Sequence, residues 1–320
     1  MTRPVLVLSA LLLIALPLSL LAGQVWIDPF GPPVRNAVPI LMELRAPRAV
    51  LALLVGGGLG ASGAAMQGYL RNPLADPGLF GVAPMAALGA VLSFYTGYAV
   101  QPYALPAFAL VGGALAMALL ALIAGRTAGL ALFTLAGMMI ASLAGALTSL
   151  AISLSPNPFA LSEIVTWLMG ALADRGWSDV AIAAPFTLAG LAILSRTGRG
   201  LDALTLGEEA ARSLGVDPVR LQWLMVAGVG ALVGAGVAVA GIIGFVGLIV
   251  PHLVRPFTDH RPSALLLPSA LAGALLLLLA DCLCRVVPLP GGELRLGIAL
   301  SLGGAPFFLH LLLRLRRDVA

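Results

Sequence analysis

Lysine is absent from this 320-residue sequence, because all eighteen basic residues are arginines. This absence excludes a Schiff-base lysine and the lysine of a Walker A phosphate loop. Charged residues of all kinds make up only 10% of the chain, against about 25% in soluble proteins. The composition therefore excludes a soluble enzyme and a nucleic-acid binder. If the activity consumes ATP, another polypeptide must bind the nucleotide.

Cysteine and histidine, the usual metal ligands, are also scarce. Cys282 and Cys284 lie two positions apart, about 200° around a helix, so we interpret them as buried apolar residues rather than as a metal pair or a disulfide. His252, His260 and His310 form no HxxxH pair, and the chain has no GxSxG or HExxH motif. We expect no catalytic residue, metal site or cofactor in this chain, and we interpret His252 as a packed helix-end residue rather than a haem ligand.

Apolar residues, by contrast, make up 60% of the chain, and the mean hydropathy is +1.04. Long apolar runs recur from end to end, which predicts an all-α polytopic membrane protein and excludes a β-barrel. The nine long runs cover about 4–26, 47–70, 79–96, 103–124, 130–153, 179–195, 221–243, 264–285 and 295–313. Residues 244–256 are too short for a full crossing and predict a short or partly re-entrant tenth span. We interpret the first run as a retained span rather than a signal peptide.

The arginines indicate the orientation of these ten predicted spans. An even number of spans places both termini on one side of the membrane. If that side is cytoplasmic, twelve arginines lie inside and six outside, as the positive-inside rule expects. We therefore predict cytoplasmic termini.

Glycine is concentrated in the second and seventh predicted spans. The pairs Gly56/Gly60 and Gly230/Gly234 have the small-xxx-small spacing that allows helices to approach closely. Because the second and seventh predicted spans are similar and lie five spans apart, we predict a weak five-helix internal repeat within a single domain covering residues 1–320. Ordinary membrane-helix glycine is the alternative interpretation.

Two segments are predicted not to cross the membrane. Residues 159–179 follow the helix-breaking sequence SPNP and predict a short amphipathic helix on the outer face. Residues 196–220 form the longest polar stretch, on the arginine-rich side, and contain two short helical patterns joined at Gly207.

Six ordered sequence blocks carry a resemblance to a known family. They are LRAPR (44–48), GASGAAMQGYLRNPLADPGLFGV (60–82), LGEEAARSLG (206–215), GFVGLIVPHLVR (244–255), LLLADCLCR (277–285) and LGGAPFFLHLLLR (302–314). With them the chain resembles the FecCD-type permeases of ABC importers for ferric siderophores, haem and cobalamin. The resemblance implies a bacterial inner-membrane permease, in contact with membrane lipid, that works as a homodimer with two copies of a separate ATPase and one periplasmic binding protein. ATP and Mg would then be bound by the ATPase.

The block RNPLADPG ends the second span, because its two prolines cannot donate backbone hydrogen bonds and Asn72 and Asp76 favour turns. A plain interhelical turn is one interpretation. The resemblance implies another, in which Asn72 and Leu74 form a cytoplasmic gate. The second gate element of the family's cobalamin permeases carries small hydroxyl residues, whereas Leu130 and Ala131 stand at these positions here.

The resemblance implies further roles for three groups of residues. The ATPase would dock on a coupling loop made of Leu206, Gly207, Glu208, Ala211, Leu214 and Gly215. The binding protein would pair its carboxylates with Arg45, Arg48 and Arg285, for which lipid-phosphate contact is the alternative. The pathway would be lined by Met138, Met139, Ser142, Thr148 and Ser149 of the fifth span, which carry no charge and suit a bulky, semi-polar metal chelate.

The main alternative function is an ion-gradient-driven secondary transporter with inverted repeats. Such transporters usually carry intramembrane carboxylates, yet Asp281, near the end of a span, is the one acid in an apolar run that could serve this purpose. The sequence leaves open which chelate is carried.

Overall fold

The computed structural model describes residues 3–28, 30–31, 36–101, 103–124, 130–155, 157–287 and 292–319. Within these ranges the chain is helical and has no strand, which confirms the all-α polytopic prediction. The helices are α1 (Arg3–Leu21), α2 (Ala37–Pro39), α3 (Ala46–Tyr69), α4 (Val82–Tyr95), α5 (Ala104–Ala124), α6 (Leu130–Ser153), α7 (Pro158–Leu168), α8 (Trp177–Ser195), α9 (Gly198–Leu204), α10 (Glu208–Ser213), α11 (Pro218–Ala240), α12 (Val246–Val254), α13 (Pro262–Val286) and α14 (Leu296–Val319).

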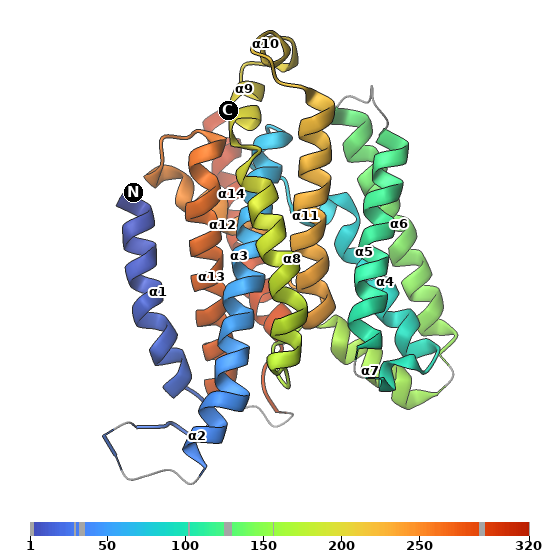
Figure 1. Ribbon diagram of the computed structural model, residues 1–320, viewed down its shortest axis with the longest axis vertical. Helices are drawn as coiled ribbons and strands as arrows, with labels where there is room; N and C mark the ends of the chain where they lie inside the picture. The colour runs from blue at the N-terminus through green and yellow to red at the C-terminus, as the bar shows by residue number, and fades with distance from the viewer. Residues whose placement is uncertain are drawn as a thin grey trace.

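The long helices run side by side, and the short α9 and α10 project from one end of the bundle (Figure 1). We call this end the coupling end; the opposite end carries α2 and α7. The start of α1 and the last turns of α14 lie toward the coupling end (Figure 1). Both described ends of the chain therefore lie on one side of the bundle, while the side of the membrane that this represents stays a prediction.

Seven helices in the described ranges are long and apolar enough to cross a membrane: α1, the continuous stretch Ala37–Tyr69 that includes α3, α5, α6, α8, α11 and α13. The predicted span 79–96 is shorter than expected, because a 3₁₀ turn at Pro77–Phe80 and the left-handed Gly81 precede α4. The segment 244–256 contains the nine-residue α12 followed by a 3₁₀ turn, which agrees with its predicted short length, whereas its entry into the membrane stays a prediction. The total of ten crossings stays a prediction.

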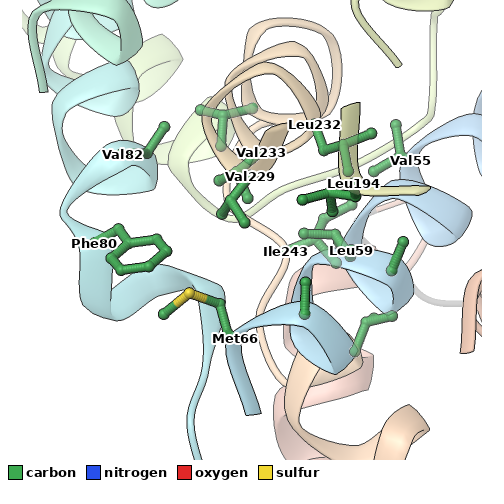
Figure 2. Packing of buried hydrophobic residues seen from close by; sticks show 14 of the residues in the cluster. Val55, Leu59, Met66, Phe80, Val82, Leu194, Val229, Leu232, Val233 and Ile243 are labelled. Carbon is green, nitrogen blue, oxygen red and sulfur yellow. The ribbon is translucent and has the colours of Figure 1, made fainter. Parts of the chain in front are cut away.

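Two helices, α3 and α11, form the centre of the bundle, since most of their residues are buried, whereas α1 is largely exposed. Val55 and Leu59 of α3 and Val229 and Leu232 of α11 meet in the apolar core (Figure 2). These two helices are the glycine-rich second and seventh predicted spans. Their matching central positions agree with an internal repeat, which remains a prediction.

Glycine explains how closely α3 packs against α13. A Cβ atom at Gly56 would meet the carbonyl oxygen of Gly273, and one at Gly60 would overlap the carbonyl oxygen of Ser269. Both carbonyls belong to α13, so the two helix backbones touch along one face of α3. The spacing Gly56/Gly60 predicted this close approach correctly. In the second predicted pair, Gly230 packs against Met117, while nothing lies within 4 Å of a Cβ built on Gly234.

Candidate functional site

The coupling loop forms two short helices, as the sequence predicted. Gly207 separates α9 from α10 with φ +100°, a conformation that side-chain-bearing residues rarely adopt. Leu206 and Leu214 are 67% and 64% exposed, which leaves two leucines uncovered at the tip of the coupling end. Glu208 lies in the first turn of α10, where its negative charge interacts favourably with the positive end of the helix dipole.

One residue of the predicted docking surface is not available to a partner. Ala211 is completely buried, and α10 packs against α9. Ala211 therefore offers no exposed side chain to a partner, and its part in ATPase docking stays a prediction. Leu206, Leu214 and Gly215 are the exposed members of the coupling loop, and Gly207 and Glu208 are half-buried.

The coupling loop is also tied to the start of α13. The carboxylate of Asp202 in α9 accepts hydrogen bonds from the backbone N–H of Ser263 at 2.9 Å and from its hydroxyl at 2.6 Å. Ser263 is the second residue of α13, and the residue before this helix, Arg261, makes no side-chain cap. Asp202 therefore caps α13 from another segment of the chain. Sequence spacing gave no signal of this contact, because the two residues are 61 positions apart.

The segments that carry the two predicted gate elements are neighbours at the coupling end of α3 and α6. The side-chain oxygen of Asn72 accepts a hydrogen bond from the backbone N–H of Leu74 at 2.9 Å, which makes the predicted turn. Tyr69 at the end of α3 packs edge-on against Phe133 in the first turn of α6, with ring centroids 5.5 Å apart. Leu130 and Ala131 precede Phe133 in the first turn of α6; Leu130 is half-buried and Ala131 is exposed. The segments of both gate elements thus meet through Tyr69 and Phe133, and the function of Asn72, Leu74, Leu130 and Ala131 as a gate stays a prediction.

One side of α6 packs on the bundle and the other is uncovered. Its buried residues are Phe133, Ala136, Gly137, Ile140 and Ala144. Of the predicted pathway residues, Met138, Met139, Ser142 and Ser149 are exposed and Thr148 is half-buried. The uncovered side is therefore mostly apolar with a few hydroxyls, and its side chains are largely exposed in the single chain.

The three arginines predicted to dock a binding protein lie at the opposite end, but they are buried. Arg45, Arg48 and Arg285 are only 8%, 9% and 3% exposed. Arg48 Nε lies 2.8 Å from Oδ1 of the fully buried Asp281, and Arg285 Nε lies 3.1 Å from Oδ2 of the same carboxylate. Arg48 also pairs with Glu293, because its Nη1 lies 2.7 Å from Glu293 Oε2. We call the three arginines, Asp281 and Glu293 the arginine cluster.

The remaining arginine contacts join the cluster to the end of α1. Arg45 donates to the backbone carbonyls of Leu20 and Leu21, both at 2.9 Å, and of Val25 at 2.6 Å. Arg285 donates to the carbonyl of Ala22 at 3.2 Å. The guanidinium groups expected to pair with carboxylates of a binding protein therefore have partners within this chain. Lipid-phosphate contact, the alternative interpretation, is likewise disfavoured by this burial.

Metal ligands do not gather anywhere in the described parts of the chain, where no three His, Cys, Asp or Glu side chains lie close enough to hold an ion. His252 packs edge-on against Phe307 at a centroid distance of 6.0 Å. Cys284 is buried and Cys282 is half-buried, with its sulfur 3.2 Å from an Arg285 nitrogen.

Comparison with known proteins identifies the family. The model of the FecCD transport family matches residues 7–314. The chain belongs to the FecCD transport family. It is 40% identical over 316 residues to the uncharacterized ABC transporter permease protein YvrB of Bacillus subtilis, covering 94% of this chain and 88% of YvrB. It is 39% identical over 319 residues to the vitamin B12 import system permease protein BtuC of Vibrio cholerae, covering 96% and 94% of the two chains.

The fold of this FecCD member is also similar to that of a solved transporter. An inward-facing structure described as a metal-chelate type ABC transporter superposes with a TM-score of 0.89 at 33% identity, covering 97% of this chain and 98% of the solved one. The chain is therefore a transmembrane permease of an ABC transporter and not a catalytic subunit.

Proposed function

We propose that this chain is the permease of a binding-protein-dependent importer that carries a metal chelate across the bacterial inner membrane. The observation that carries the proposal is the exposed α9–α10 surface on a polytopic FecCD fold. Leu206 and Leu214 are large apolar side chains in water at the tip of a helical pair, a surface suited to burial by a partner protein. The chain has no lysine for a nucleotide-binding loop, so the partner is an ATPase with its Mg-bound nucleotide.

In the proposed importer the permease works as a homodimer with two ATPase subunits, and the uncovered side of α6 supports the homodimer. A mostly apolar helix face with hydroxyls, turned away from the core of its own chain, can line a pathway shared with a second copy. Met138, Met139, Ser142, Thr148 and Ser149 would then face a passing chelate, without a charge that would hold it tightly. Specificity would reside mainly in the soluble binding protein. Siderophore, haem and cobalamin complexes remain the candidate cargoes.

The binding protein would dock at the arginine-cluster end. Arg48 is the member of the cluster best placed for this role, because its second partner, Glu293, has a side chain that is 30% exposed. A carboxylate of the binding protein would compete with Glu293 for Arg48, while Asp281 keeps its pairs inside.

The alternative, an ion-driven secondary transporter, is disfavoured by the same cluster. A coupling carboxylate must be free to exchange an ion or a proton with a cavity. Asp281 instead lies between two guanidinium groups and is completely buried.

Reconstitution in proteoliposomes with the cognate ATPase and binding protein tests the proposal. We expect uptake of the binding protein's ligand only with hydrolysable ATP, and no change when sodium or proton gradients are collapsed. Uptake driven by an ion gradient without ATP would refute it. The absorption spectrum of the ligand purified with the binding protein would identify the chelate, because haem, cobalamin and ferric siderophores absorb differently.

The gate has a separate test. In a background that lacks Cys282 and Cys284, we expect Asn72→Cys and Leu74→Cys to crosslink between the two protomers in a nucleotide-dependent manner. Crosslinking that ignores nucleotide, or labelling from the lipid phase, would place both residues on the periphery.

A further inference from the structure

A cavity at the end opposite the coupling loop is not explained by the roles assigned so far. It has a volume of about 440 Å³ and lies between the ends of α4 and α5, the helix α7 and the segments that lead into α8 and α14. Its lining includes Trp167 of α7, Arg175 before α8 and Arg295 before α14. These residues come from three separate parts of the chain, so the fold itself assembles the cavity.

Hydrogen-bond donors without acceptors distinguish this cavity. Trp167 is 8% exposed, and its indole Nε1–H is buried with no hydrogen-bond partner in the described residues. The Nε–H of Arg175 is also buried and has no hydrogen-bond partner in the described residues. A buried donor left without an acceptor costs about 1–3 kcal/mol, so a pair of them beside one cavity indicates a missing acceptor.

The charges around the cavity indicate the sign of that acceptor. Neither Arg175 nor Arg295 has a carboxylate within ion-pair distance in the described ranges, whose four ion pairs involve Arg48, Arg261 and Arg285. Burial lowers the pKa of Arg175; the charges of Asp179 and Asp174 raise it in part, and the charge of Arg295 lowers it more weakly. Two guanidinium groups thus repel each other across a space that an anion would fill.

The acidic residues of the lining restrict which anion fits. Glu163 and Asp174 also border the cavity, but both are exposed to solvent, whereas the unpartnered donors are buried. Carboxylates at the rim repel a small polyanion more than a single anionic group on a large, otherwise neutral molecule. The cavity is therefore suited to one carboxylate or phosphate group entering from a larger ligand.

We propose that this cavity binds a carboxylate group of the transported chelate, held by the guanidinium groups of Arg175 and Arg295 and by the indole N–H of Trp167. The proposal rests on the transport function proposed above and narrows its cargo to chelates that bear at least one free carboxylate. A phosphate group would satisfy the same donors, and a phospholipid headgroup is its other possible source.

Binding of a matched pair of probes tests the site directly. Full-length permease in phosphatidylcholine nanodiscs would be titrated with 4-fluorobenzoate and with neutral 4-fluorobenzamide, followed by ¹⁹F NMR against empty nanodiscs. We expect saturable binding of the carboxylate, competition by orthophosphate, and binding of the amide that is at least about tenfold weaker. Arg175→Gln and Arg295→Gln should each weaken carboxylate binding by about tenfold to a hundredfold, the range for the loss of a charged hydrogen bond.

Two further variants keep the test independent of folding. Arg261→Gln removes an arginine that is 72% exposed at the other end of the molecule, and it should leave probe binding unchanged. Trp167→Phe removes the indole N–H but keeps an aromatic ring, and it should weaken carboxylate binding without affecting the amide. Equal binding of the two probes, or full binding by the Arg175 and Arg295 variants, would overturn the proposal and leave a cavity that holds only water.

Lipid and cargo are separated by mass spectrometry and by transport. A phospholipid that stays bound to the wild-type permease but not to Arg175→Gln would assign the site to a lipid headgroup and overturn the cargo proposal. If both arginine variants bind no probe but still support normal ATP-driven uptake, the cavity proposal is overturned while the proposed transport function stands. Absence of ATP-driven uptake in the wild type would overturn the proposed function, while the probe titration could still be measured.

Discussion

Replacement of Asp281 by asparagine is the sharpest test of the arginine cluster. The carboxylate is completely buried and lies within 3.1 Å of nitrogens of both Arg48 and Arg285. Removing one partner of a buried ion pair costs about 3–5 kcal/mol, because the remaining charge stays buried and uncompensated. Arg48 keeps Glu293, so we expect the lower part of this range, about 3 kcal/mol. At about 2–4 °C per kcal/mol for a large domain, the melting temperature should fall by about 6–12 °C.

The assay is thermal unfolding of the purified full-length permease in one detergent, with Glu293→Gln as the matched control. Glu293 pairs with the same arginine but its side chain is 30% exposed, so its loss should cost at most about 1 kcal/mol. The double variant Asp281→Asn with Arg285→Gln should recover part of the loss, because one uncompensated buried charge is removed with its partner. A melting temperature for Asp281→Asn as high as that of Glu293→Gln would refute the reasoning that the acid neutralises two buried arginines.

Three more substitutions test the coupling end and the packing of α3. Gly207→Leu should abolish copurification of the ATPase, because a leucine is strained at φ +100° even though an added Cβ meets nothing within 4 Å, and this strain should cost about 1–3 kcal/mol; normal ATPase binding would remove this turn from the docking surface. Gly60→Leu should destabilise the bundle by more than about 3 kcal/mol or prevent its accumulation in the membrane, because the side chain would overlap the Ser269 carbonyl; a normal melting temperature would contradict the contact. Asp202→Ala should cost about 0.5–2 kcal/mol and speed hydrogen exchange of the Ser263 amide, and unchanged exchange would show that the cap is not formed.

The sequence predicted the features that depend on local chemistry. The turn after α3 follows from the prolines and Asn72 of RNPLADPG, and α7 begins where Asn157 caps it, with its side-chain oxygen 2.8 Å from the Ala160 amide. The predicted amphipathic segment 159–179 is only partly helical, because α7 ends at Leu168 and α8 begins at Trp177. Hydropathy does not separate these two helices, since the turn between them is itself largely apolar.

The contacts of individual side chains could not be predicted, because they depend on how each helix is rotated in the bundle. Arg48 and Asp281 are 233 positions apart, and nothing in their neighbouring residues indicates that α3 and α13 turn these two side chains toward each other. The positions of the three arginines at helix ends were predicted, whereas their burial was not. Ala211 illustrates the same limit, since an alanine fits equally well on an open surface and in a packed core.

The contacts at its two ends give α13 a mechanical consequence. At one end Asp202 of the coupling helix α9 holds the second residue of α13, and near the other end Asp281 holds Arg48 and Arg285. Between them the 25-residue helix extends for about 37 Å and touches the glycines of α3 backbone to backbone. A partner that displaces α9 must therefore either break the two hydrogen bonds of Asp202 or push α13 along its axis. In the second case the continuous helix α13 transmits the displacement to the buried arginines at its far end, because no flexible loop interrupts it.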